Sequence, residues 1–329
     1  MTEREITEPI DLCLPDGHLN PDAVGWSRQP LHTPNLRMWG RAKRWEYWGI
    51  LTPTHMIGVT VSSLDYAGLE SLYVLERATH EEVVVDAVVP LARGVVLPER
   101  CGVGRSHASA HGLTIDIDET DEGTRVRAVT SDVSLDIVAA RPAGHECLAV
   151  VVPWSARRFQ YTVKDLGRPA SGVLHIGGER VEIDPSTAYA VLDHGRGKWP
   201  YAIRWNWSAS HGVVDGQVID LQLGGRWTDG TGSTENAVFV DGGAHKIGAQ
   251  LRWRYDRHHW LRPWHIEGPG IDVTFHPEHE REASTFLVLV ANATHQCFGR
   301  FEGYVTADDG TRVRVDGLDG WAEEAANRW

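Results

Sequence analysis

Apolar and polar positions alternate over short runs along the whole chain, and Gly, Asp and Pro bound these runs. Such runs are typical of β-strands, and no stretch keeps the apolar period of about 3.6 residues that an amphipathic helix requires. Clear examples are residues 56–62, 82–90, 113–117, 124–130, 172–176, 213–223, 271–275 and 311–315. Gly177-Gly178 and Asp309-Gly310 each separate two strand-like runs, as hairpin turns do. The pattern predicts an all-β protein with few short helices, and the most helix-like segment is 320–329.

The two halves of the chain repeat the same order of features. Residues 44–48, RWEYW, lead into one string of strand-like runs, and residues 204–207, RWNW, lead into another. This order indicates a diverged duplication. Two strings of about eight short antiparallel strands each suit two barrels or strongly bent sheets, because closure removes exposed strand edges. We therefore expect an N-terminal extension at 1–30 and two antiparallel β-barrel domains at 31–184 and 185–329.

Charge and cysteine usage narrow the possible partners and location. The net charge of −13, from 32 Lys and Arg against 45 Asp and Glu, disfavours nucleic acid and anionic membranes as partners. The four cysteines, Cys13, Cys101, Cys147 and Cys297, are scattered without a CxxC motif, which predicts reduced thiols. The acidic N-terminus lacks a signal-peptide pattern, and no segment reaches about eighteen uninterrupted apolar residues. We expect a cytoplasmic protein without an integral membrane segment.

The densest candidate chemistry lies at residues 192–207, LDHGRGKWPYAIRWNW, which combine an acid, a histidine, a lysine, two arginines and three tryptophans. An acid next to a histidine can transfer protons, and the glycines on either side of Arg196 allow a sharp turn. The chain holds 14 Trp against 6 Phe and 8 Tyr, and so much aromatic surface favours a bulky apolar ligand. The stretch predicts a polar pocket with aromatic walls.

Four residues are candidates for acid/base catalysis: Asp193, His194, Glu46 and Glu235. A carboxylic acid desolvated among tryptophans has a raised pKa and can protonate an alkene or a carbonyl, with His194 as relay or base. The alternative for Asp193 is structural, either a pair with Arg196 or Arg204 or a cap on the following loop. Glu46 can likewise pair with Arg44 along a strand face, and Glu235 can close a hairpin.

Candidate ligand-binding side chains accompany these acids. Tryptophan faces can line a cavity and stabilise a developing carbocation, or they can simply pack a core. Asparagine can bind a ligand carbonyl, and arginine can bind an acid. The candidates are Arg44, Trp48, Trp199, Arg204, Trp205, Asn206, Trp207 and Asn236.

No motif predicts a metal or a cofactor. The close histidine pairs are His107 and His111, His258 and His259, and His276 and His279, and none has a third ligand at a diagnostic spacing such as HExxH. The patterns of serine hydrolases, P-loop proteins and dinucleotide-binding folds are also missing from the sequence. We expect a reaction without a cofactor.

Several motifs together resemble the domain-of-unknown-function 2804 family over residues 14–329. They are LDHGRGKWPYAIRWNW, TENAVFVDG, LPDGHLNPDAVGWSRQP, KRWEYW, LDYAGL, HQCFGRFEGYV and DGLDGWAEE. That family is distantly similar to a group with two lipocalin-like barrels, which includes carotenoid hydratases, tocopherol cyclase-like proteins and decalin-forming cyclases. The resemblance implies two lipocalin-like (calycin-like) antiparallel β-barrel domains, and it carries no catalytic residue to a numbered position.

Three functional hypotheses follow. The leading one is a cofactor-independent acid/base enzyme, a hydratase, dehydratase, isomerase or cyclase, acting on a hydrophobic terpenoid- or polyketide-like small molecule. The alternative is a non-catalytic lipid or hydrophobic small-molecule binding protein. The third is a scaffold in which the tryptophans only join the two domains. The sequence leaves the substrate, the reaction direction and the oligomeric state open.

Overall fold

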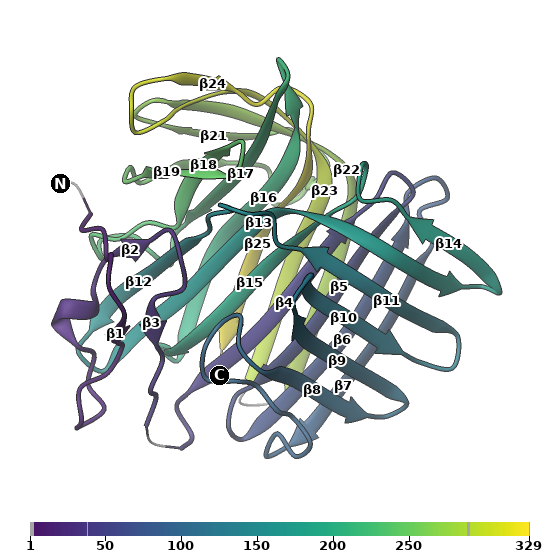
Figure 1. Cartoon of the computed structure of the whole chain (residues 1–329), viewed down its shortest axis with the longest axis horizontal. Coiled ribbons are helices and arrows are strands. Elements are labelled where there is room, and N and C mark those ends of the chain that lie inside the picture. Colours follow the sequence, from purple (N-terminus) through teal and green to yellow (C-terminus); the bar gives the residue numbers. More distant parts are fainter. Residues whose placement is uncertain (1–2, 38, 288–289, 329) are drawn as a thin grey trace. The chain divides into compact units, whose positions relative to one another are not determined.

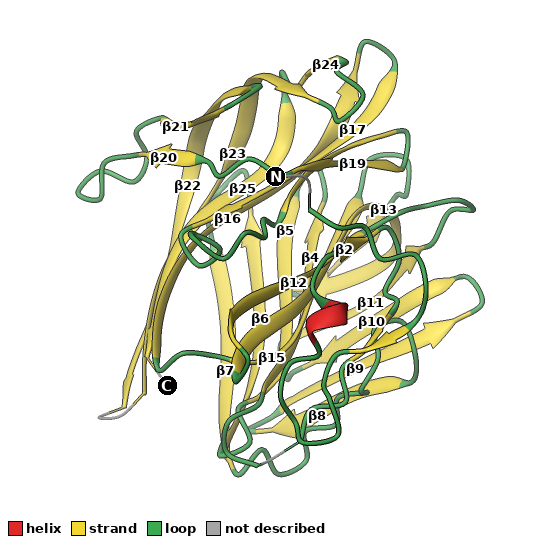
Figure 2. Cartoon of the chain, turned by 90° about the vertical axis from the view of Figure 1, so that its left-hand side faces the viewer, coloured by secondary structure: helices red, strands yellow, loops and turns green. Residues whose placement is uncertain are grey.

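The computed structural model describes residues 3–37, 39–287 and 290–328. It consists of strands and one short 3-10 helix, η1 (Pro21–Ala23), so the all-β prediction is confirmed (Figure 2). No helix within these ranges has the length and apolar character needed to cross a bilayer. The chain forms two compact units: Ile6–Trp199, here the N-terminal unit, and Pro200–Trp329 together with Met1–Glu5, here the C-terminal unit.

The N-terminal unit is built on a sheet that curls into a nearly closed barrel. Its strands follow the order β7-β6-β5-β4-β15-β13-β11-β10-β9-β8, and β8, at one end, also contacts β5, β6 and β7 (Figure 1). The bounds are β4 (Lys43–Leu51), β5 (His55–Ser63), β6 (Ala67–Glu76), β7 (Glu82–Pro90), β8 (Arg105–Ala110), β9 (Leu113–Thr120), β10 (Gly123–Val129), β11 (Val133–Ala140), β13 (Arg158–Ile176) and β15 (Tyr189–Lys198).

Shorter strands extend this unit. Strand β12 (Leu148–Ser155) pairs with β13 and with β2 (Trp26–Ser27), and β14 (Glu179–Ile183) pairs with a later part of β13. Strands β1 (Ile10–Asp11) and β3 (His32–Thr33) form a parallel pair of their own.

The C-terminal unit is a curled half-barrel. Its strands follow the order β19-β18-β17-β16-β25-β23-β22-β21-β20, and β24 adds to β23. The bounds are β16 (Ala202–Val214), β17 (Gln217–Gly225), β18 (Asn236–Val240), β19 (Gly243–Ile247), β20 (Arg252–Arg254), β21 (Trp264–Gly268), β22 (Ile271–Leu287), β23 (Val290–Thr306), β24 (Arg312–Arg314) and β25 (Leu318–Arg328).

Both units wind in the same order, as a diverged duplication requires. In each, the first long strand pairs with the next strand in sequence on one side and with the last strand on the other: β4 lies between β5 and β15, and β16 lies between β17 and β25. A very long strand follows the last strand in each sheet, β13 in one unit and β23 in the other. The RWEYW and RWNW segments that echo each other in sequence therefore occupy equivalent strands.

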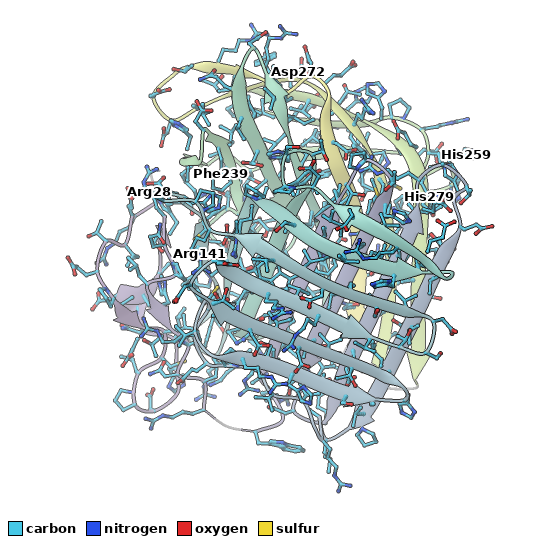
Figure 3. The ribbon with its side chains drawn as sticks, turned by 45° about the vertical axis from the view of Figure 1, so that its right-hand side comes forward. Arg28, Arg141, Phe239, His259, Asp272 and His279 are labelled. Atoms are coloured by element: carbon cyan, nitrogen blue, oxygen red, sulfur yellow. The ribbon has the colours of Figure 1, made fainter. Side chains whose placement is uncertain are left out.

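Strand alternation gives each sheet one apolar face, here called its core face. Side chains leave the strands on both sides (Figure 3). The core face of the N-terminal unit carries Trp48, Val59, Leu72 and Leu192, and that of the C-terminal unit carries Leu221, Phe275, Phe301 and Ala322. These faces decide which polar residues become buried.

The helix-like tail is a strand. Ala and Glu at 322–326 favour a helix locally, but β25 pairs with β16 on one side and β23 on the other along most of its length. Two complete ladders of backbone hydrogen bonds outweigh the intrinsic propensity. The final residue of the expected segment, Trp329, lies outside the described residues.

The domain boundary also differs from the expected one at residue 184. Strand β15 pairs with β4 and β13, so the N-terminal unit continues to Trp199. Most of the expected N-terminal extension also belongs to this unit, because β2 pairs with β12. Glu3 instead belongs to the C-terminal unit, where its carboxylate lies 2.7 Å from Lys246 Nζ and accepts from Thr234 Oγ1 at 2.8 Å.

Candidate functional site

A row of polar side chains crosses the core face of the N-terminal unit. The strand register places His194 of β15 opposite Glu46 of β4, Glu46 opposite Val61 of β5, and Val61 opposite Glu70 of β6. Glu46 alternates with the core residue Trp48, and Glu70 alternates with Leu72. Two strand spacings separate the backbones of Glu46 and Glu70, roughly 10 Å. Two carboxyl groups thus face the same interior with one valine between them.

Glu46 lies between two nitrogen groups. Its Oε1 is 3.4 Å from His194 Nδ1 and 3.6 Å from Arg196 Nη2, and both partners are almost completely buried. Burial alone would raise the pKa of Glu46, but His194 and Arg196 favour the carboxylate and leave its pKa below the ordinary value. Glu46 is therefore ionised at neutral pH.

His194 is the opposite case. Burial, followed by the neighbouring Arg196 cation, lowers the pKa of His194 to about 4 although Glu46 opposes the shift. The imidazole is neutral at pH 7, so Arg196 is the cation that stabilises the Glu46 carboxylate there. Arg196 is anchored by donating to three carbonyls, those of Trp45 at 2.8 Å, Gly195 at 2.9 Å and Pro98 at 2.9 Å.

Glu70 has no comparable cation. Its side chain is 1% exposed, and neither carboxyl oxygen has a hydrogen-bond partner of normal geometry. Burial raises the pKa of Glu70, and the nearby Ala110 backbone, His107 and His111 offset this only in part. The core face therefore carries two carboxyl groups whose pKa values are shifted in opposite directions, that of Glu46 downward and that of Glu70 upward. Sequence reasoning missed Glu70, although its alternation with Leu72 and Val74 marks an acid on an apolar face.

Several buried polar atoms around this row have no hydrogen-bond partner in the protein. They are both ring nitrogens of His194, Tyr161 Oη, Ser106 Oγ, Trp48 Nε1 and Arg196 Nε. The rings of Tyr161 and His194 are adjacent, with centroids 6.5 Å apart. An unsatisfied buried polar group costs about 1–3 kcal/mol, so an interior that served packing alone would favour apolar residues here. The cluster can instead bind polar atoms of a ligand or of water.

The opposite face of β15 is structural. Asp193 lies 2.9 Å from Lys164 Nζ and accepts from Thr162 Oγ1 at 3.1 Å, so its partners differ from the arginines weighed in the sequence. Because adjacent strand residues face opposite ways, Asp193 does not share the core face with His194. A Cβ at Gly195 would lie 2.1 Å from the Trp45 ring, so only glycine lets that indole lie across the strand.

The other candidates in the N-terminal unit make structural contacts. Trp199 packs edge-to-face on Trp45, with centroids 5.5 Å apart, and on Trp154, at 5.3 Å. Arg44 Nη1 lies 2.7 Å from Asp65 Oδ1 and does not pair with Glu46 as the strand-face alternative expected. Of the candidates, the core face brings together Glu46, His194 and Trp48.

The remaining candidates lie in the C-terminal unit. Glu235 accepts from the Trp227 indole, and Asn236 accepts from the Gly224 amide at 2.6 Å and donates to the Ala249 carbonyl at 2.9 Å. On β16, the indoles of Trp205 and Trp207 donate to Glu323 and to Gln222, each at 2.8 Å. Asn206 donates to the Tyr255 hydroxyl at 3.0 Å. Arg204 is exposed. Through its bond to Tyr255, Asn206 is linked to the wall of an open pocket.

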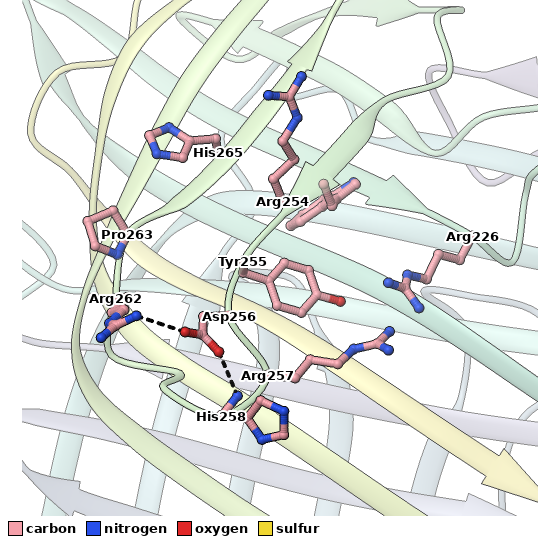
Figure 4. Close-up of a pocket in the computed structure, with 10 residues that line it drawn as sticks. Arg226, Arg254, Tyr255, Asp256, Arg257, His258, Arg262, Pro263 and His265 are labelled. Carbon is pink, nitrogen blue, oxygen red and sulfur yellow. Dashed lines mark hydrogen bonds and ion pairs between the residues drawn. The ribbon is translucent and has the colours of Figure 1, made fainter.

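That pocket has a volume of about 850 Å³ and is rich in arginine (Figure 4). It is lined by Arg226, Trp253, Arg254, Tyr255, Asp256, Arg257, His258, Arg262, Pro263 and His265. Beneath it, Glu324 of β25 accepts from Tyr255 Oη and from Arg257 Nη2 at 2.8 Å. None of these arginines was among the candidates from the sequence, although RWRYDRHHWLRPWH at 252–265 concentrates three of the four in one segment.

One group of side chains in the described ranges could offer three atoms to a metal ion: Glu280, Glu282 and His295. Glu282 is exposed, and His295 already bonds to Glu280 at 2.8 Å and stacks on Trp260 with centroids 4.1 Å apart. The expectation of a cofactor-free reaction stays a prediction.

Comparisons with known proteins agree with the fold. The family model described as Domain of unknown function (DUF2804) matches residues 3–329. An ATTH-like protein from Nitrosomonas europaea has a similar structure, with 13% identity, a TM-score of 0.55, and 86% of this chain and 92% of that chain covered. Kievitone hydratase from Nectria haematococca has 12% identity and a TM-score of 0.52, with 88% and 89% covered. No curated protein matches the chain. At these identities the likeness shows the fold alone. The nearly closed barrel and the curled half-barrel of the structure fit the two barrel-like domains that the sequence predicted.

Proposed function

The chain belongs to the DUF2804 family, and we propose that it is a cofactor-independent acid/base enzyme whose reaction takes place on the core face of its N-terminal unit. The substrate class is a hydrophobic terpenoid- or polyketide-like small molecule, and the reaction is a hydration or dehydration, with isomerisation or cyclisation using the same groups. The observation that carries the proposal is the row of Glu46, His194 and Glu70 on one face. The pKa values of the two glutamates in this row are shifted in opposite directions. The name of kievitone hydratase, a structure of the same fold, supports this class.

The opposite pKa shifts suit one carboxyl group to act as general base and the other to act as general acid. Glu46, whose pKa is lowered, takes the role of proton acceptor, and Glu70, whose pKa is raised, takes the role of proton donor. Their backbones lie roughly 10 Å apart with Val61 between them, so a substrate that contacts both carboxyl groups lies against this valine. A pair of acids pushed apart in pKa is the usual arrangement of a general base and a general acid.

In the hydration direction, Glu46 removes a proton from a water molecule while the water oxygen forms a bond to one carbon of a polarised double bond. The Glu70 proton forms the new C–H bond at the other carbon. Glu46 ends protonated and Glu70 ends ionised, and proton exchange with solvent restores both. The reverse sequence eliminates water. Each proton transfer contributes typically 10²–10⁴-fold to the rate.

The neighbouring unsatisfied groups orient the substrate. Neutral His194 offers one donor and one acceptor nitrogen, and Tyr161 remains a phenol because burial holds its pKa well above the ordinary value. Either group can donate to a substrate carbonyl. The surrounding Trp48 and Leu192 side chains provide an apolar environment that strengthens these hydrogen bonds.

The second candidate function is a non-catalytic binding protein for the same ligands. The buried nitrogen and oxygen atoms without hydrogen-bond partners would bind a ligand in a carrier as well as in an enzyme. The two functions differ in whether Glu46 and Glu70 matter for turnover.

The test starts from ligands extracted from the purified protein and identified by mass spectrometry. The wild type, Glu46→Gln and Glu70→Gln are incubated with each compound in water labelled with heavy oxygen. We expect the wild type to add or remove one water and to incorporate the label, and each variant to lose at least about 10²-fold in turnover while still binding.

Asp136→Asn is the matched control, since Asp136 is a partly exposed carboxylate of the same unit that pairs with Arg125. Its turnover should equal that of the wild type. Unchanged turnover in both glutamine variants would overturn the enzyme assignment. Binding without any conversion by the wild type would establish the carrier instead.

A further inference from the structure

The arginine-rich pocket of the C-terminal unit is a second place where a ligand can bind, independent of the chemistry of the N-terminal unit. The chain from β20 to β21 supplies most of it, and Arg226, after β17, completes it. Its volume of about 850 Å³ lies within the range typical of small-molecule sites, about 300–1,000 Å³.

The charges around the pocket are unequal. Arg254 pairs with Glu267, and Arg262 lies 2.9 Å from Asp256, so these two arginines are balanced. Arg257 lies 2.8 Å and Arg226 lies 3.5 Å from the same oxygen, Oε2 of Glu324. Two guanidinium groups therefore share one carboxylate, which leaves one positive charge uncompensated in a chain whose net charge is −13.

Both arginines also retain donors for a ligand. Arg257 uses Nε and Nη2 on Glu324, at 3.0 and 2.8 Å, whereas a guanidinium group carries five N–H donors. The side chains of Arg257 and Arg226 are 43% and 33% exposed, so the remaining donors are accessible from the pocket. Figure 4 shows the Tyr255 hydroxyl pointing toward these two guanidinium groups. A planar guanidinium matches a carboxylate in size and geometry.

The rest of the wall is aromatic and fixed. Tyr255 stacks on Trp264, with centroids 4.1 Å apart and ring planes 18° apart, and on Trp260 at 5.6 Å. Its hydroxyl donates to Glu324, and its pKa is raised to about 12 by burial and by that carboxylate, so it stays protonated. Trp253 adds a second ring to the wall, and its indole N–H has no acceptor in the protein.

We propose that this pocket binds a small aromatic carboxylate, with the acid on Arg226 and Arg257 and the planar body against Trp253 and Tyr255. The aromatic walls favour such a ligand over inorganic phosphate, which would use only the cations. The wide opening to solvent weakens the electrostatic attraction, so binding is salt-dependent.

The test is isothermal titration of the whole chain with 2-naphthoate, with its neutral analogue 2-naphthamide and with inorganic phosphate. We expect naphthoate to bind at least about tenfold more tightly than the amide or phosphate. Arg257→Gln and Arg226→Gln should each weaken naphthoate binding by about tenfold.

Arg300→Gln is the control, because Arg300 is an exposed arginine of the same unit that pairs with Glu278. Its affinity should match the wild type, and melting temperatures confirm that each variant is folded. Equal binding of acid and amide by the wild type would overturn the proposal. Phosphate binding as tight as naphthoate binding, or undiminished binding in both pocket variants, would do so as well.

Discussion

The first and last strands of each unit pair in the same way, yet the two pairs carry different chemistry. In the N-terminal unit, β4 and β15 place Glu46 opposite His194, whereas in the C-terminal unit β16 and β25 place Asn206 opposite Glu324 at the equivalent position of the core face. Glu46 and His194 are surrounded by polar atoms without partners, whereas Glu324 accepts from Tyr255 and Arg257. The same pairing of first and last strands thus holds a buried carboxylate beside an imidazole without hydrogen-bond partners in one unit, and a hydrogen-bonded carboxylate in the other.

The difference lies in what surrounds each pair. Strands β5, β6 and β8 enclose the first pair within a nearly closed barrel, so burial dominates the pKa of His194. The second pair adjoins an open pocket, where arginine side chains reach the carboxylate while keeping contact with solvent. Closure of the sheet therefore buries the first pair, whereas the open pocket leaves the partners of the second pair partly exposed.

The largest expected effect is a pH dependence of the free energy of unfolding, which arises at His194 in the N-terminal pair. Since the folded pKa of His194 is lowered to about 4, the unfolded chain binds a proton below about pH 6.5 while the folded chain does not. Stability is thus present above pH 6.5 and is lost as the pH falls toward 4, by about 1.4 kcal/mol per pH unit from this residue. Urea unfolding of wild type and His194→Asn should show this slope in the wild type and a smaller one in the variant. Identical slopes would contradict the burial argument.

Next in size is a change on the other face of the same strands. Gly195 lies opposite Trp45, and the equivalent pair in the C-terminal unit is Ala325 opposite Trp205. A methyl group at Gly195 would collide with the Trp45 ring, so Gly195→Ala should lower the free energy of unfolding by about 2 kcal/mol.

The reciprocal variant Ala325→Gly tests whether the two positions differ in the way described. It removes no clash and should cost about 1 kcal/mol through backbone entropy and a lost buried methyl. Denaturant unfolding checks both values. A Gly195→Ala variant as stable as the wild type would show that Trp45 can move away.

The smallest expected effect concerns the satisfied carboxylate. Glu324→Gln keeps an acceptor oxygen but removes the charge shared by Arg226 and Arg257, which are partly exposed, so solvent screens much of the loss. We expect a decrease of about 1 kcal/mol in the free energy of unfolding, smaller at high salt. A decrease of the same size at every salt concentration would show that charge is not the cause.

The sequence was informative where local pattern decides structure. Strand alternation predicted the all-β architecture, the repeat of RWEYW and RWNW predicted equivalent strands, and the paired positions of Glu46 and His194 were both among the candidates. The prediction of a helix-like segment at 320–329 was wrong. Its Ala and Glu content favours a helix, but pairing with β16 and β23 determines its conformation.

The rest of the site depends on register. Glu70 becomes part of the row only because β5 and β6 align it with Glu46, and no spacing along the chain reports that alignment. Asp193 was the leading acid in the sequence, yet its partner Lys164 comes from β13. The shared role of Arg226 and Arg257 likewise requires β25 to bring Glu324 beneath them.

The most direct test of the proposed division of labour is the protonation state of Glu70. Infrared difference spectra of wild type against Glu70→Gln, recorded across a pH titration, report the C=O stretch of a protonated carboxyl group. The account predicts a Glu70 band that persists above the ordinary pKa of 4.5, together with a Glu46 signal, from wild type against Glu46→Gln, that is ionised at the same pH. Titration of both groups together near 4.5 would contradict it.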